Sequence, residues 1–237
     1  MSKLALIVLV TISMCLAQTV SASAPGKETA QWTDSFQEDK SDLAAAGKNP
    51  FFILVPGYYL IFEGTENGQK VELRITVLDE TKSVDGVETR VIEEREIMNG
   101  KVIEISRNFF AISRRTNSVY YFGEDSKEYK DGRVVSQKGS WEAGVNGARF
   151  GLMMPGTVLL GSRYYEEIAP QIAMDRAETV SISETVQVPA GKYLGCLKAE
   201  ETTPLEPKSK EYKLYAPGIG LIRDGDLQLV RYGYANR

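Results

Sequence analysis

Apolar and polar side chains alternate with a period of two residues from Phe51 onward, and this alternation constrains the fold more than any other feature of the chain. In the segment 71–77, for example, every second residue is apolar and the residues between them are polar. This period is typical of a β-strand with one buried face, because a helix needs an apolar residue every three or four positions. We therefore expect little helix after Pro50.

Dipeptides that favour tight turns separate these alternating segments. Four of them are Asn67-Gly68, Asp85-Gly86, Asn99-Gly100 and Asp131-Gly132. Such pairs are strong signals for two-residue β-hairpin loops. The expected strands span residues 58–63, 71–77, 87–98, 101–112, 119–122, 158–168, 179–188, 192–201, 211–216 and 227–234. Because so many twisted strands curl or close, the sequence predicts an all-β domain over residues 51–237: a single curved antiparallel sheet, as a half-barrel, a clam or a complete barrel.

The N-terminal residues have the composition of a secretory signal peptide. Lys3 precedes an apolar run over residues 4–16, and the small residues Ala22 and Ala24 follow it. The run is shorter than the roughly 20 apolar residues that a membrane-spanning helix needs. We therefore expect residues 1–22 to be removed, leaving a periplasmic or secreted protein with no transmembrane segment.

The two cysteines refine this expectation. Cys15 follows Met14, where a lipoprotein signal has a small residue, so we interpret it as part of the signal peptide, with lipid attachment at Cys15 as the alternative. Cys196 is then the lone cysteine of the exported chain and has no internal disulfide partner. Stability must therefore come from the size of the hydrophobic core.

Residues 23–50 are polar and rich in small side chains, and they are expected to form a linker with one short helix. Asp34 or Ser35 would cap this N-terminal helix, and Phe36 and Leu43 would lie on one of its faces.

Composition excludes several chemistries. The chain has no histidine and a formal net charge of −4. A nucleophile activated by histidine and a histidine-ligated metal are therefore excluded, and no basic patch favours nucleic acid. Gly218-Ile219-Gly220 lacks the rest of a dinucleotide motif, and Asp224-Gly225-Asp226 is better explained as a turn than as a calcium site. We predict no catalytic residues, no cofactor, no metal site and no nucleic-acid partner.

Two charged residues occur on otherwise apolar faces of expected strands. Glu184 lies in the strand 179–188, and Arg107 lies in the strand 101–112. A buried carboxylate is costly unless it is paired. Glu184 and Arg107 are therefore candidate ligand-binding residues and potential partners of one another, with a β-bulge or an edge position at Glu184 as the alternative.

The segment 139–156 interrupts the alternation with glycines and large apolar side chains, and we expect a long loop there. Long loops inside compact β domains are usually functional, and methionine adapts to ligands of varied shape. Trp141, Phe150, Met153 and Met154 are therefore candidate ligand-binding residues. The alternative is that these side chains plug one end of the core.

Several segments form a set of motifs: Val188-Pro189-Ala190-Gly191-Lys192-Tyr193, Cys196-Leu197-Lys198, Glu211 to Leu221 with the sequence YAPGIGL at its end, Asn49-Pro50-Phe51-Phe52, Tyr120 to Asp125 and Gly139 to Gly144. Together they resemble a widespread family of uncharacterised bacterial envelope proteins. More broadly, the chain is similar to periplasmic β-clam proteins such as lipoprotein carriers, which bind acyl chains in a curved sheet. This resemblance implies a lipid or another apolar ligand and brings no catalytic residues with it.

Three classes of function fit these observations. A non-enzymatic binding or carrier protein for an apolar or amphipathic ligand is favoured, because export and a curved sheet rich in aromatic residues suit a ligand groove. A structural or interaction module of an envelope complex is the alternative, and it would show an exposed apolar patch at residues 141–154. A carboxylate-dependent hydrolase is the third, and it requires paired acids in a cleft.

Overall fold

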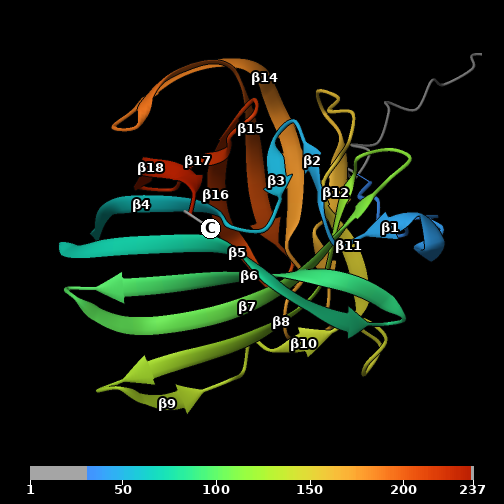
Figure 1. Ribbon diagram of the computed structural model, residues 1–237, viewed down its shortest axis with the longest axis horizontal. Coiled ribbons are helices and arrows are strands. Elements are labelled where there is room, and N and C mark those ends of the chain that lie inside the picture. Colours follow the sequence, from blue (N-terminus) through green and yellow to red (C-terminus); the bar gives the residue numbers. More distant parts are fainter. Residues whose placement is uncertain (1–30, 236–237) are drawn as a thin grey trace, which may run out of the picture. The chain divides into compact units, whose positions relative to one another are not determined.

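The computed structural model describes residues 31–235, so the predicted signal peptide and residues 23–30 lie outside the described range. The described residues fold almost entirely as strands (Figure 1). The elements are η1 (Lys40–Asp42), β1 (Leu43–Ala44), β2 (Gly47–Asn49), β3 (Phe52–Leu54), β4 (Tyr58–Glu66), β5 (Gln69–Val84), β6 (Val87–Met98), β7 (Lys101–Ser113), β8 (Val119–Lys130), β9 (Arg133–Ser136), β10 (Trp141–Glu142), β11 (Arg149–Met154), β12 (Arg163–Tyr165), β13 (Glu167–Ile168), β14 (Arg176–Val188), β15 (Gly191–Thr203), β16 (Glu206–Ala216), β17 (Gly220–Asp224) and β18 (Leu227–Tyr234). Within residues 31–235, no helix has the length and apolar character to cross a membrane.

One antiparallel sheet curls until its two edges nearly meet. Its strand order is β12-β14-β15-β16-β17-β18-β4-β5-β6-β7-β8-β11-β13 (Figure 1). The edge strands β12 and β13 belong to one short segment, residues 163–168, which pairs first with β14 and then with β11. This segment therefore joins the two edges, and the predicted curved sheet takes the form of a nearly closed barrel.

The hairpin turns form where the sequence predicts them. Asn67, Asp85, Asn99 and Asp131 have φ angles of +49°, +48°, +49° and +50°, and each is followed by a glycine that also has positive φ. Two successive residues with positive φ make the type I′ turn, whose twist matches that of the flanking strands. The strands β4 to β9 are consequently joined by short turns, apart from the β7–β8 connection.

Apolar side chains form cores on both faces of the sheet. Phe109 and Phe110 are neighbours in β7 and point to opposite faces. Phe110 belongs to the core inside the curve, together with Phe62 and Leu197. Phe109 belongs to a second core on the outer face, where Trp141 is also buried. Strands β7 and β8 are therefore covered on both sides over part of their length.

The helix expected near Phe36 is not present in the described residues. A single 3-10 turn, η1, takes its place, and Asp39 caps this turn by accepting a hydrogen bond from the backbone N–H of Ser41 at 2.9 Å. Leu43 then pairs with β7 and is buried in the outer core. The prediction was wrong because pairing with the sheet satisfies this backbone, and two apolar residues seven positions apart fit a strand-paired segment as well as a helix.

The segment 139–156 is not a long loop. It forms β10 and β11, which both pair with β8. Gly151 in β11 allows residues 163–168 to approach, because a Cβ at this position would lie 2.4 Å from the carbonyl carbon of Glu166. Gly151 therefore allows two strands to approach closely, and it does not act as a flexible loop residue.

Candidate binding cavity

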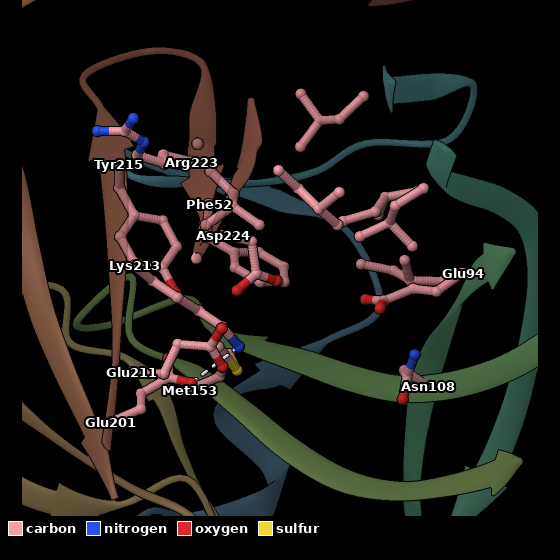
Figure 2. Close-up of a pocket in the computed structure, with 18 of the residues that line it drawn as sticks. Phe52, Glu94, Asn108, Met153, Glu201, Glu211, Lys213, Tyr215, Arg223 and Asp224 are labelled. Atoms are coloured by element: carbon pink, nitrogen blue, oxygen red, sulfur yellow. Dashed lines mark ion pairs between the residues drawn. The ribbon is translucent and has the colours of Figure 1, made fainter. Parts of the chain in front are cut away.

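The inner face of the barrel encloses a cavity of about 1100 Å³ (Figure 2). Side chains from β4 to β8 and from β15 to β18 line most of it. Small-molecule sites typically occupy about 300 to 1000 Å³, so this cavity has room for a ligand of that size. Exposed lining residues, including Glu66 at the end of β4 and Asp226 between β17 and β18, place its mouth at these hairpin ends.

The hairpin formed by β2 and β3 lies at the apolar part of the cavity. Asn49 is buried at this hairpin, and its side-chain N–H₂ donates to the carbonyl oxygens of Asn117 and Pro155 at 2.9 Å each. Its side-chain oxygen accepts from the backbone N–H of Phe51 at 2.8 Å. These bonds fix the hairpin so that Phe52 packs on Phe110, with ring centroids 5.2 Å apart.

Polar side chains occupy one wall of the cavity, on β6, β7 and β8. Glu94 is directly opposite Ser106, and Asn108 is directly opposite Glu124, so all four share the inner face. Asn108 donates to the hydroxyl of Ser106 at 3.2 Å and accepts a hydrogen bond from the hydroxyl of Tyr121. We call Glu94, Glu104, Ser106, Asn108 and Glu124 the glutamate wall.

Burial changes the proton affinity of this wall. It raises the pKa of Glu94 to about 7, with smaller contributions from neighbouring carboxylates, although the positive charge of Lys213 acts in the opposite direction. Burial also raises the pKa of Glu124 to about 8, and the charges of Glu94 and Glu104 add to this effect. The ionised carboxylate is disfavoured because the protein replaces the water that would solvate it.

A second charged group faces the glutamate wall from β15, β16 and β17 (Figure 2). Glu201 is opposite Glu211, and Lys213 is opposite Asp224, so their side chains share the inner face. Lys213 Nζ lies 2.8 Å from Glu201 Oε2. Burial acts to lower the pKa of Lys213, but the charges of Asp224 and Glu201 outweigh it and raise that pKa well above its ordinary value.

The segment that joins the sheet edges adds two buried acids to the cavity lining. Glu166 and Glu167 are 4% and 5% exposed. Glu167 accepts a hydrogen bond from the backbone N–H of Asp175 at 2.9 Å. Burial raises the pKa of both carboxyl groups well above the ordinary value, and Glu201 adds to the effect at Glu166.

Of the apolar residues predicted to bind ligand, Met153 lines the cavity. Met154 is buried in the inner core, and Trp141 and Phe150 pack in the outer core. Trp141 contacts the ring of Tyr121, which lines the cavity, at a centroid distance of 5.2 Å. Of these four residues, Met153 therefore lines the cavity, and the other three pack in the cores on the two faces of the sheet.

The two charged residues predicted to bind ligand, Arg107 and Glu184, are not part of the cavity lining and do not pair with each other. Arg107 pairs with Glu80 on the outer face. Glu184 is opposite Cys196 in the β14–β15 hairpin, and the strand register shifts on both sides of it. These register shifts agree with the β-bulge alternative for Glu184, and the suggested Glu184–Arg107 pair is not formed.

Sequence reasoning missed the glutamate wall. In the strand 87–98, both alternating faces contain apolar and charged residues, so the pattern does not show which face is inward. The run Glu93-Glu94-Arg95-Glu96 within an expected strand is the feature of the sequence that could have indicated this wall. Among the described residues, no group of three or more His, Cys, Asp or Glu side chains is arranged to hold a metal ion.

Comparisons with known proteins do not establish a family. No family model and no curated protein matches the sequence. A crystal structure from Parabacteroides distasonis, described as that of a "putative lipoprotein", covers 79% of this chain and 100% of its own, with 13% sequence identity and a TM-score of 0.39. The motif resemblance to envelope proteins therefore stays a prediction.

Proposed function

We propose that this protein is an exported, non-enzymatic binding or carrier protein that holds an apolar or amphipathic ligand inside its barrel, in the periplasm or outside the cell. The observation that carries the proposal is the cavity of about 1100 Å³, which is lined by aromatic and aliphatic side chains and by acids. A large cavity with a few convergent polar groups is the usual form of a ligand site. The predicted signal peptide supports export.

The test is binding of the neutral fluorescent probe N-phenyl-1-naphthylamine to the protein after removal of copurified lipid. Ile75 lines the cavity and is half-buried, so Ile75→Trp should fill part of the space and reduce probe affinity. Arg74→Trp is the matched control, because Arg74 is exposed on the other face of the same strand. No probe binding, or equal binding by both variants, would contradict the proposal.

Native mass spectrometry of protein purified from its own envelope supplies a second measurement. A copurifying lipid or other amphipathic molecule, lost from Ile75→Trp and retained by Arg74→Trp, is the expected result. A copurifying protein in place of a small molecule would favour the interaction-module alternative. The apolar patch that this alternative requires at residues 141–154 is not formed by Trp141 or Met154, since both are buried.

A carboxylate-dependent hydrolase is the second candidate, because Glu94 and Glu124 share one cavity and have pKa values raised to about 7 and about 8. A general acid needs a pKa near the working pH. The test is turnover of chromogenic glycosides and esters. Turnover that Glu124→Gln abolishes would replace the binding proposal with this one.

A further inference from the structure

We propose that the ligand of this cavity is a cationic amphiphile, whose positive group lies between Glu201 and the glutamate wall and whose apolar chain lies toward Phe52 and Phe110. This inference rests on the proposed binding function and names the class of ligand. Its occupant is one molecule with a charged end and an apolar end, because Phe52 and Phe110 pack together in the lining while Glu201 and the glutamate wall supply acids.

Acidic side chains outnumber basic ones in the lining of the cavity. Twelve Asp or Glu side chains and four Lys or Arg side chains belong to the described lining of the cavity. Several of these acids lie close together, and the charges of Glu66 and Glu104 add to burial in raising the pKa of Glu96. Near neutral pH the carboxyl groups of Glu94 and Glu124 are partly protonated, because burial raises their pKa values to about 7 and about 8, and a cation beside them favours their ionised form. The lining therefore favours a cation over an anion, more strongly than an open surface would because the barrel wall excludes water.

Most of the basic side chains in the lining already have an acidic or aromatic partner. Lys213 pairs with Glu201, and Lys210 lies 2.9 Å from Glu200. Lys198 lies over the ring of Tyr212, 4.0 Å from its centroid. Among the described residues, no ion pair joins a basic side chain of the lining to Glu94, Glu104 or Glu124.

The wall of the cavity also contains a buried acceptor without a hydrogen-bond partner. Glu201 is 9% exposed, and its Oε1 has no hydrogen-bond partner among the described residues, although Oε2 contacts Lys213. A buried polar atom without a partner costs about 1 to 3 kcal/mol. A turn of the Glu201 carboxyl group would present this oxygen to an ammonium group in the cavity, and Figure 2 shows Glu201 and Glu94 on opposite walls of the cavity.

Arg223 is the lining residue that would favour a competing ligand, an anionic amphiphile. Its Nε is buried without a partner in the described structure, and its side chain also lines the cavity. An anionic amphiphile would use this group. The chain neighbour of Arg223 is Asp224 and its direct cross-strand partner is Leu214, and acids outnumber bases in the described lining by twelve to four. The acids of the lining therefore favour the cation over the anion.

The experiment compares three ligands that share a ten-carbon chain: decylammonium, decanol and decanoate. Each ligand is titrated against N-phenyl-1-naphthylamine bound to the exported protein, from which copurified lipid has been removed. The titrations are done near neutral pH, with each ligand below its critical micelle concentration. We expect half-displacement by decylammonium at a concentration about tenfold lower than by decanol, with decanoate the weakest of the three.

Two variants show where the positive group binds. Glu94→Gln keeps the shape of the side chain and removes its charge, so it should reduce the preference for decylammonium over decanol severalfold while leaving decanol unchanged. Glu93→Gln is the matched control, because Glu93 is on the other face of β6 and pairs with Arg95. Thermal melting of both variants confirms that each is folded.

The outcomes separate this inference from the proposed function. Equal displacement by decylammonium and decanol, tighter binding of decanoate, or an unchanged preference in Glu94→Gln would overturn the inference and leave a binding protein of another specificity. If the probe itself does not bind, or none of the three ligands displaces it, both the inference and the proposed function fail.

Discussion

Single buried acids, such as Glu124, contribute to the pH dependence of the free energy of unfolding. Burial, together with the carboxylates of Glu94 and Glu104, raises the pKa of Glu124 from 4.5 to about 8, while hydrogen bonds involving Ser106 and Tyr121 oppose the shift. The folded protein therefore keeps a proton on Glu124 at pH values where the unfolded chain has lost it. Its contribution to the free energy of unfolding is present below about pH 4.5 and is lost as the pH rises through about 8.

Glu124→Gln tests this linkage, because glutamine does not ionise. Between about pH 4.5 and about pH 8, the variant should lose less unfolding free energy than the wild type. The difference at the alkaline end should be about 1 to 3 kcal/mol. Urea unfolding across the pH range is the measurement. Glu128→Gln is the control on the same strand, because Glu128 is exposed. Parallel stability curves for wild type and Glu124→Gln would contradict the assignment.

At the scale of single elements, β11 shows how one strand serves both packing and binding. Met153 and Met154 are adjacent in it, yet Met153 lines the cavity and Met154 is 1% exposed in the inner core. A register shift in the pairing of β11 with β8 occurs between Leu152 and Met154. Such a bulge changes the direction of neighbouring side chains, so the two methionines have different roles.

Separate alanine substitutions distinguish these roles. Met154→Ala should lower the free energy of unfolding by about 2 to 5 kcal/mol, the usual cost of truncating a buried methionine, without changing probe affinity per folded molecule. Met153→Ala should cost less stability and change probe affinity. Denaturant unfolding and probe titration measure both quantities. A large loss of probe affinity in Met154→Ala alone would show that the structural assignment of the pair is wrong.

At the scale of the whole barrel, closure depends on residues 163–168, which join the two edges of the sheet. Gly151→Ala should prevent their approach, since the added Cβ would lie 2.4 Å from the backbone of Glu166. We expect it to cost more than the roughly 1 kcal/mol that replacing a turn glycine by alanine costs.

Gly100→Ala measures that turn cost for comparison, because Gly100 has a φ of +80° and no atom near its would-be Cβ. Thermal unfolding of both variants, with probe binding, is the measurement. Equal destabilisation by the two substitutions would show that closure at Gly151 contributes little.

The amino-acid sequence by itself determined most of the long strands and their tight hairpins, but not the short strands within residues 139–168. The period of two and the Asn-Gly and Asp-Gly pairs act through local backbone geometry, so the strand predicted at 87–98 coincides with β6. The sequence pattern also suggested a bulge at Glu184 as an alternative, and the strand register shifts on both sides of this residue.

Only the tertiary structure decided which faces point inward and how the sheet closes. The faces of β6 and β7 contain charged and apolar residues alike, and pairing between β11 and residues 163–168 joins positions that local rules treat separately. The same long-range pairing replaced the expected N-terminal helix and the expected loop at 139–156 with strands. The cavity and its glutamate wall follow from closure, because a carboxylate becomes buried only when distant strands surround it.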